Sequence, residues 1–234
     1  MSKSDVASRV GMTSSDRRSQ TLRAYHELRR RILENEMAAG TQYLEQTLAD
    51  ELGMSRTPVR EALIRLSDER LVEVKPRHGA RVLPVSVSDM GEIYELLSTL
   101  EAIAAQRVAE RGLNTAQLAR LDAAVGGMEQ ALDRNDLIAW SSFDREFHNA
   151  IVELSGNRRL VQVVSIFRDQ AHRARMQTLK LRPKPVQSNR DHAALVAAIR
   201  KRDGKSAYDI HCRHRQEAGR MLLKLLAGQK AEGL

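Results

Sequence analysis

The chain has 234 residues, of which 42% are hydrophobic and 29% charged, so it can fill one or two packed domains and is not a disordered protein. Its one cysteine, Cys212, excludes an intrachain disulfide, and the lack of a long apolar run excludes a membrane span. The net charge of +8 is compatible with a polyanionic partner such as nucleic acid. The N-terminal segment has no apolar core of a signal peptide, so we expect a cytoplasmic protein.

The first part of the chain predicts a tail followed by a helix. Residues 1–18 are rich in serine, arginine and aspartate without periodicity, which indicates a disordered tail. Residues 19–36 carry apolar side chains at helical spacing, and Gly40 follows in the connection.

Residues 44–66 predict two short helices joined by a tight turn. In the first, Leu44, Leu48 and Leu52 recur every four residues; in the second, Val59, Leu63 and Leu66 are spaced by four and then three. Gly53 suits the left-handed position that ends the first helix. Ser55 can cap the second helix, with Pro58 in its first turn, where no backbone N–H is needed.

The second of these helices begins with two arginines. Arg56 and Arg60 lie one turn apart at its start, where guanidinium groups can reach base edges and phosphates. Residues 71–74 and 80–83 then predict two strands around a turn at 76–79. The hairpin reads as a wing, so residues 19–84 predict a winged helix-turn-helix domain.

After a linker at 84–88, residues 88–228 predict a second domain made only of helices. The expected helices occupy residues 88–104, 113–132, 137–154, 160–179, 186–200 and 206–226, with a break at 182–185. The fold class is therefore mainly α, with a six-to-seven-helix antiparallel bundle after the winged helix-turn-helix.

A group of histidines in the second domain is a candidate metal site. Asp144 and His148 are four residues apart and share one helix face, while His192 and the pair His211 and His214 lie on later helices. Imidazoles and a carboxylate suit Zn²⁺, Ni²⁺, Mn²⁺ or Fe²⁺. From the residues alone, each histidine also fits an ordinary place in the core or on the surface.

Two stretches give the chain a family resemblance. MSRTPVREALIRL, followed by LVEVKPRHGARV, resembles the winged helix-turn-helix of the GntR family of bacterial transcription regulators. FDREFHNAIVELSGNRRL and DHAALVAAI resemble the FCD effector domain of its FadR-type subfamily. The resemblance implies a palindromic DNA operator bound by a homodimer, and a small-molecule effector, most simply a carboxylate, bound in the helical domain.

The resemblance also implies roles for particular residues. The positions that it assigns to DNA contact are Ser55, Arg56, Thr57, Arg60, His78 and Gly79. Arg77 flanks the wing turn and is a further candidate for DNA contact. The positions that it assigns to a divalent metal ion are Asp144, His148, His192 and His214.

One position departs from the family pattern. Many relatives carry an arginine on the first helix of the effector domain that pairs with the effector's carboxylate, whereas this chain has Leu97 there, in YELLSTLE. Arg168, Arg173 or Arg175 is a candidate replacement, and His211 is a candidate to line the pocket. Alternatively, the pocket around Leu97 is more apolar than usual.

We expect a ligand-responsive repressor or activator and no enzyme. A metal-dependent enzyme is an alternative, because an Asp/His centre can activate water. Against it, no paired acid/base motif and no cofactor fingerprint accompany the histidines. A non-specific DNA-binding structural protein is a further alternative, but it gives the helical domain no purpose.

Overall fold

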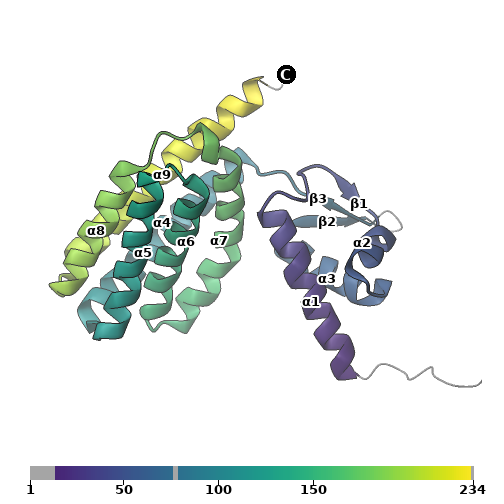
Figure 1. The fold of residues 1–234 in the computed structure, drawn as a ribbon, viewed down its shortest axis with the longest axis horizontal. Coiled ribbons are helices and arrows are strands. Elements are labelled where there is room, and N and C mark those ends of the chain that lie inside the picture. The colour runs from purple at the N-terminus through teal and green to yellow at the C-terminus, as the bar shows by residue number, and fades with distance from the viewer. Residues whose placement is uncertain (1–13, 76–78, 233–234) are drawn as a thin grey trace, which may run out of the picture. The chain divides into compact units, whose positions relative to one another are not determined.

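The computed structural model describes residues 14–75 and 79–232 (Figure 1). The chain divides into two compact units, with the division between Pro84 and Val85. Each unit has its own core of buried apolar side chains. The predicted fold class, a winged helix-turn-helix followed by a helical bundle, is confirmed.

The first unit is built around the helix-turn-helix. Its helices are α1 (Ser14–Leu33), α2 (Glu45–Leu52) and α3 (Arg56–Asp68). Gly53 ends α2 with φ of 62°, the left-handed conformation predicted for it. Leu28, Leu48 and Leu63 are fully buried and bring the three helices into one core.

A three-stranded sheet completes this unit. The hairpin consists of β2 (Val72–Lys75) and β3 (Gly79–Val82), which pair antiparallel with Val72 opposite Val82. A third strand, β1 (Gln42–Tyr43), was not predicted; it pairs with the other edge of β3. Two residues carry too little periodicity to be recognised, and the pairing partner lies far along the chain.

The second unit is a bundle of long helices. They are α4 (Val87–Arg111), α5 (Thr115–Asp133), α6 (Leu137–Leu154), α7 (Arg158–Thr178), α8 (Val186–Arg200) and α9 (Gly204–Glu232), with a short 3₁₀ helix, η1 (Leu179–Leu181), after α7. The most extensive helix pairing is between α4 and α9. No helix in the described ranges is long and apolar enough to cross a membrane.

Two predicted boundaries are wrong. Helix α1 begins at Ser14, so residues 14–18 are helical, although the sequence analysis placed them in the tail; residues 1–13 lie outside the described part of the chain. Helix α4 begins at Val87, before the predicted start at 88, and Ser86 caps it, because the Ser86 hydroxyl accepts a hydrogen bond from the Asp89 N–H at 3.3 Å.

Candidate metal centre and DNA-contacting face

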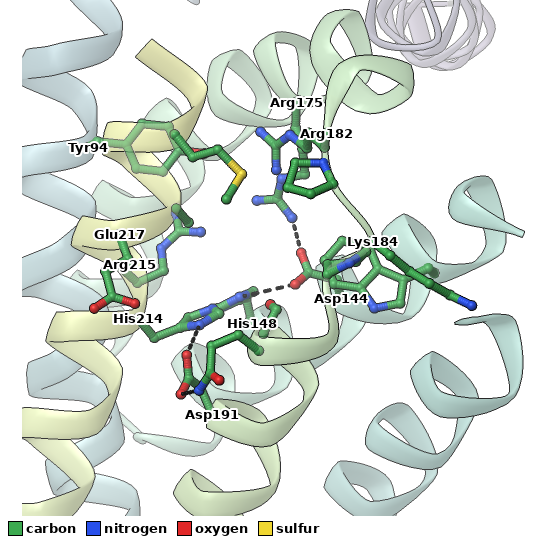
Figure 2. A pocket seen from close by; sticks show the side chains of 17 residues that line it. Tyr94, Asp144, His148, Arg175, Arg182, Lys184, Asp191, His214, Arg215 and Glu217 are labelled. Carbon is green, nitrogen blue, oxygen red and sulfur yellow. Dashed lines mark hydrogen bonds and ion pairs between the residues drawn. The ribbon is translucent and has the colours of Figure 1, made fainter. Parts of the chain in front are cut away.

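Three helices bring the four predicted metal ligands together. Asp144 and His148 project from one face of α6, His192 comes from α8 and His214 from α9. All four side chains are buried, and one potential ligand atom of each lies within 4.8 Å of the others. The Oδ1 of Asp144 is 3.6 Å from the Nε2 of His148 and 3.6 Å from the Nε2 of His192. Figure 2 shows Asp144, His148 and His214 converging at one end of a pocket.

The three imidazole rings contact one another. The ring centroids of His192 and His214 are 4.5 Å apart, and that of His148 lies 5.2 Å and 5.5 Å from them. Rings this close around one carboxylate surround a small space.

Two further carboxylates contact the Nδ1 atoms of His148 and His214. The Oε2 of Glu101, on α4, is 3.1 Å from the Nδ1 of His148, and the Oδ2 of Asp191 is 3.3 Å from the Nδ1 of His214. A carboxylate on the outer ring nitrogen fixes the orientation of a metal-ligating histidine. The sequence analysis missed both residues. The available signal was an acidic residue on an otherwise apolar face of α4, and an aspartate directly before His192.

This arrangement fits a divalent cation. Among the described residues, neither ring nitrogen of His192 has a hydrogen-bond partner, and neither has the Nε2 of His148, which faces Asp144. Buried polar atoms without a partner are costly, and a cation would give the inward-facing nitrogens one. The donor set of three imidazoles and one carboxylate is typical of transition-metal sites in helical bundles.

A second potential ligand group is less suitable. Glu101, His148 and His211 also lie close together and are buried. However, the Nε of Arg215 is 3.2 Å from the Oε2 of Glu101, so a positive charge already occupies that position. The group around Asp144 is therefore the candidate centre.

The protonation states of the centre suit metal binding. Burial holds the pKa of His192 well below its ordinary value and also lowers the pKa of His214. Burial alone would raise the pKa of Asp144, but the charge of Arg175 and contact with His148 hold it well below its ordinary range. At neutral pH His192 and His214 are thus neutral imidazoles and Asp144 is an ionised carboxylate, the forms that bind metals.

The buried histidines predict an acid-sensitive metal-free protein. Burial lowers the pKa of His211 to about 3, against the opposing effect of Glu101, whereas an unfolded chain titrates at the ordinary value of 6.5. Below pH 6.5 the unfolded state binds a proton at His211, whereas the folded state does so only near pH 3. The free energy of unfolding therefore falls as the pH falls. We expect the free energy of unfolding of chelator-treated protein to drop between pH 6.5 and pH 3 by about 1.4 kcal/mol per pH unit for each such histidine.

Urea unfolding at a series of pH values measures this slope. His211→Gln should make this slope shallower, because it removes the titrating group. An equal slope in the wild type and His211→Gln contradicts the assignment.

A pocket of about 210 Å³ opens beside the centre (Figure 2). Asp144, His148 and His214 form part of its wall. Its other lining residues include the arginines Arg175, Arg182 and Arg215, and the apolar or aromatic residues Tyr94, Trp140, Pro183, Pro185 and Met221. Arg175 forms a buried ion pair with Asp144. The pocket thus joins the candidate centre to cationic and apolar walls.

Four of the candidate effector-binding residues, Leu97, Arg168, Arg173 and His211, are not in the wall of this pocket. Leu97 is fully buried in the core of the bundle, so its position contributes packing and no polar group. Arg168 lines a separate, smaller cavity near Glu101, and Arg173 is buried elsewhere on α7. The Nε2 of His211 faces Glu101 at 3.3 Å. Arg175, named in the sequence analysis as a possible replacement for the missing arginine, does reach the pocket.

The DNA-contacting candidates of α3 lie on an open face. Arg56 and Arg60 have side chains that are 63% and 68% exposed. Glu45, at the start of α2, contacts both: its carboxylate accepts a hydrogen bond from Arg56 at 3.2 Å and lies 3.9 Å from Arg60. Ser55 occupies the N-cap position of α3 without a capping hydrogen bond from its side chain, and Thr57 lies in the first turn.

The wing candidates have different outcomes. Arg77 and His78 lie outside the described residues. Gly79 has φ of 81°, and a Cβ there would overlap the carbonyl oxygen of Tyr43. The close approach of β1 to β3 is therefore a structural reason for glycine at this position.

Comparisons with known proteins agree with this architecture. Residues 92–217 match the FCD domain family, and residues 20–82 match the family described as "Bacterial regulatory proteins, gntR family". The chain is 40% identical over 131 residues to an uncharacterized HTH-type transcriptional regulator of Agrobacterium vitis, in an alignment that covers 55% of this chain and 77% of that protein. It is 25% identical over 193 residues to the Escherichia coli HTH-type transcriptional repressor RspR, covering 82% and 84%.

Solved structures show the same fold. That of E. coli McbR/YncC superposes with a TM-score of 0.76 at 24% identity, and the match covers 88% of this chain and 97% of that one. The chain therefore belongs to the GntR family of bacterial regulatory proteins, with an FCD domain after its winged helix-turn-helix, and it is a transcriptional regulator and not an enzyme.

Proposed function

We propose that this regulator binds a palindromic DNA operator as a homodimer and that a small organic acid, bound beside a divalent cation in the FCD domain, changes its operator affinity. As a regulator of transcription it would act in the cytoplasm. RspR carries the name of a repressor, which favours repression for this chain as well.

The DNA-reading role of α3 is supported by its exposed arginines. Arg56 and Arg60 lie one turn apart on an open helix face, and Glu45 contacts both. Arginine forks can bind the O6 and N7 atoms of guanine in the major groove. Ser55 and Thr57, beside them at the helix start, can donate to phosphates. Arg77, His78 and Gly79 on the wing would approach the adjacent minor groove.

The acid-binding role of the FCD domain is supported by the buried centre and its pocket. Asp144, His148, His192 and His214 would hold the cation, whose identity is open among Zn²⁺, Ni²⁺, Mn²⁺ and Fe²⁺. A cation that takes five or six ligands would keep one or two positions open beside these four residues, and such positions suit a carboxylate oxygen. The protein itself contributes arginines and an apolar wall to the same pocket.

The homodimer is supported by apolar side chains on the surface of α7. Val163 and Ile166 lie three residues apart and are 41% and 51% exposed. Exposed apolar residues on one helix face are typical of an interface. A two-fold dimer also matches the two half-sites of a palindromic operator.

The observation that carries the proposal is the pairing, in one chain, of an exposed arginine face on a helix-turn-helix with a buried Asp/His₃ centre that opens into a cationic pocket. The test is a gel shift with the DNA upstream of the protein's own gene, at several salt and competitor concentrations. The protein should be loaded with one metal at a time and titrated with small organic acids. We expect specific retardation that an acid changes only in metal-loaded protein.

Two results contradict the proposal. Retardation that unrelated DNA abolishes as well as the specific fragment removes the operator-binding role. Unchanged retardation across all metals and acids removes the effector role. Light scattering of the free protein tests the dimer separately.

A further inference from the structure

One arginine in the pocket wall, Arg182, lacks the carboxylate partner that the other two arginines have. Arg182 directly follows η1 and is half-buried in the pocket wall. Its Nε donates a hydrogen bond to the Thr178 hydroxyl at 3.2 Å. Its Nη2, although buried, has no hydrogen-bond partner among the described residues.

The other two arginines of the pocket are each neutralised within the protein. Arg175 forms an ion pair with Asp144, and Arg215 lies 3.2 Å from the carboxylate of Glu101. No carboxylate contacts Arg182 in the described part of the chain. Figure 2 shows Arg182 beside Arg175, on the side of the pocket from which Arg175 reaches Asp144. Among these three arginines, Arg182 is therefore the one without a carboxylate partner in the described residues.

A half-buried guanidinium without a carboxylate costs folding free energy. Burial lowers the pKa of Arg182 and the charge of Arg175 adds to this effect, while Tyr94 and the charge of Asp144 oppose it. An arginine side chain nevertheless stays charged at neutral pH. Such a group is well placed to bind an anion that enters the pocket, because a charge-assisted hydrogen bond would then satisfy the free Nη2.

The pocket has a second attachment point for an anion, at the centre formed by Asp144 and the histidines. The pocket wall also contains Tyr94, Trp140 and Met221, which suit a short carbon skeleton. The volume of about 210 Å³ lies below the range of about 300–1,000 Å³ typical of pockets for drug-sized ligands. The ligand must accordingly be small.

We propose that the effector is a small dicarboxylic acid, with one carboxylate at the Asp144–histidine centre and the second paired with Arg182. This inference rests on the proposed function of the FCD domain as an acid-binding domain. It adds that the second carboxylate is recognised and that Arg182 determines this specificity.

The test uses matched acids that differ only by the second carboxylate. Suitable pairs are succinate and butyrate, malate and 2-hydroxybutyrate, and 2-oxoglutarate and 2-oxovalerate. Binding to the full-length, metal-loaded protein is measured by calorimetry for the wild type and for Arg182→Gln. The control is Arg190→Gln, which removes an equal charge from the exposed surface of α8 outside this pocket. Thermal unfolding and metal content establish that each variant is folded and loaded.

We expect the dicarboxylate of at least one pair to bind the wild type about ten- to a hundredfold more tightly than its monocarboxylate. Arg182→Gln should remove this preference while leaving monocarboxylate affinity unchanged, and Arg190→Gln should retain it. Equal affinity for both members of every pair, or an equal loss of both in Arg182→Gln, overturns the role of Arg182 but leaves an acid effector in place. If no acid binds the metal-loaded wild type, both this inference and the proposed effector role are wrong.

Discussion

Asp144→Ala should abolish metal binding and lower the free energy of unfolding by about 3–5 kcal/mol. Asp144 is a predicted ligand, and it is also the buried partner of Arg175. The alanine variant therefore leaves a guanidinium buried without its counter-charge, while the imidazoles lose their carboxylate. Elemental analysis measures the metal, and urea unfolding of metal-free protein measures the stability.

Two further variants separate the causes. Asp144→Leu combined with Arg175→Met removes both charges, so it should recover much of the lost stability without recovering metal. Asp122→Ala breaks an exposed ion pair with Arg200 and should cost at most about 1 kcal/mol. A metal content in Asp144→Ala equal to that of the wild type rules the site out. A stability loss no larger than that of Asp122→Ala contradicts the buried pair.

The helix-turn-helix was predictable because its signals are local. The leucine spacing, Gly53 and the start of α3 follow from residues within one or two turns of one another. Strand β1 was not predictable, because β3, the strand with which it pairs, lies about forty residues further along the chain. The same limit applies to the start of α1, where polar residues give no apolar stripe.

The candidate centre was only partly predictable. Asp144 and His148 share a helix face by spacing alone, but their meeting with His192 and His214 depended on the family resemblance. Glu101, Arg182 and Arg215 were not predicted, because the packing of elements distant in the sequence brings them to the centre or its pocket. Charged residues on long helices usually face solvent, and only the packing of the bundle shows which are buried.

The effector can change operator affinity only if it binds two states of the protein with different affinity. A dicarboxylate that joins Arg182, after α7, to the centre on α6, α8 and α9 would add a direct link between these elements. Such a ligand has a physical means to favour one arrangement of these helices over another.

The largest expected effect on DNA binding comes from Arg56→Ala combined with Arg60→Ala. Each arginine is expected to contribute about 1–3 kcal/mol of base discrimination, so the double variant should weaken operator binding by roughly a hundredfold or more. Its affinity for non-specific DNA should fall much less, because phosphate contacts elsewhere persist. Both side chains are more than half exposed, so folding should be unaffected.

The measurement is a pair of binding isotherms, on operator and on unrelated DNA, at fixed salt. Arg23→Ala, which removes an exposed charge from α1, is the matched control and should lower both affinities slightly and equally. Glu45→Gln adds a finer test, because this carboxylate contacts both arginines while carrying no positive charge to DNA. If Glu45 orients them, its loss should reduce the ratio of operator to non-specific affinity even though removing a negative charge favours DNA binding in general. A higher ratio in Glu45→Gln would show instead that the carboxylate holds the arginines away from the bases.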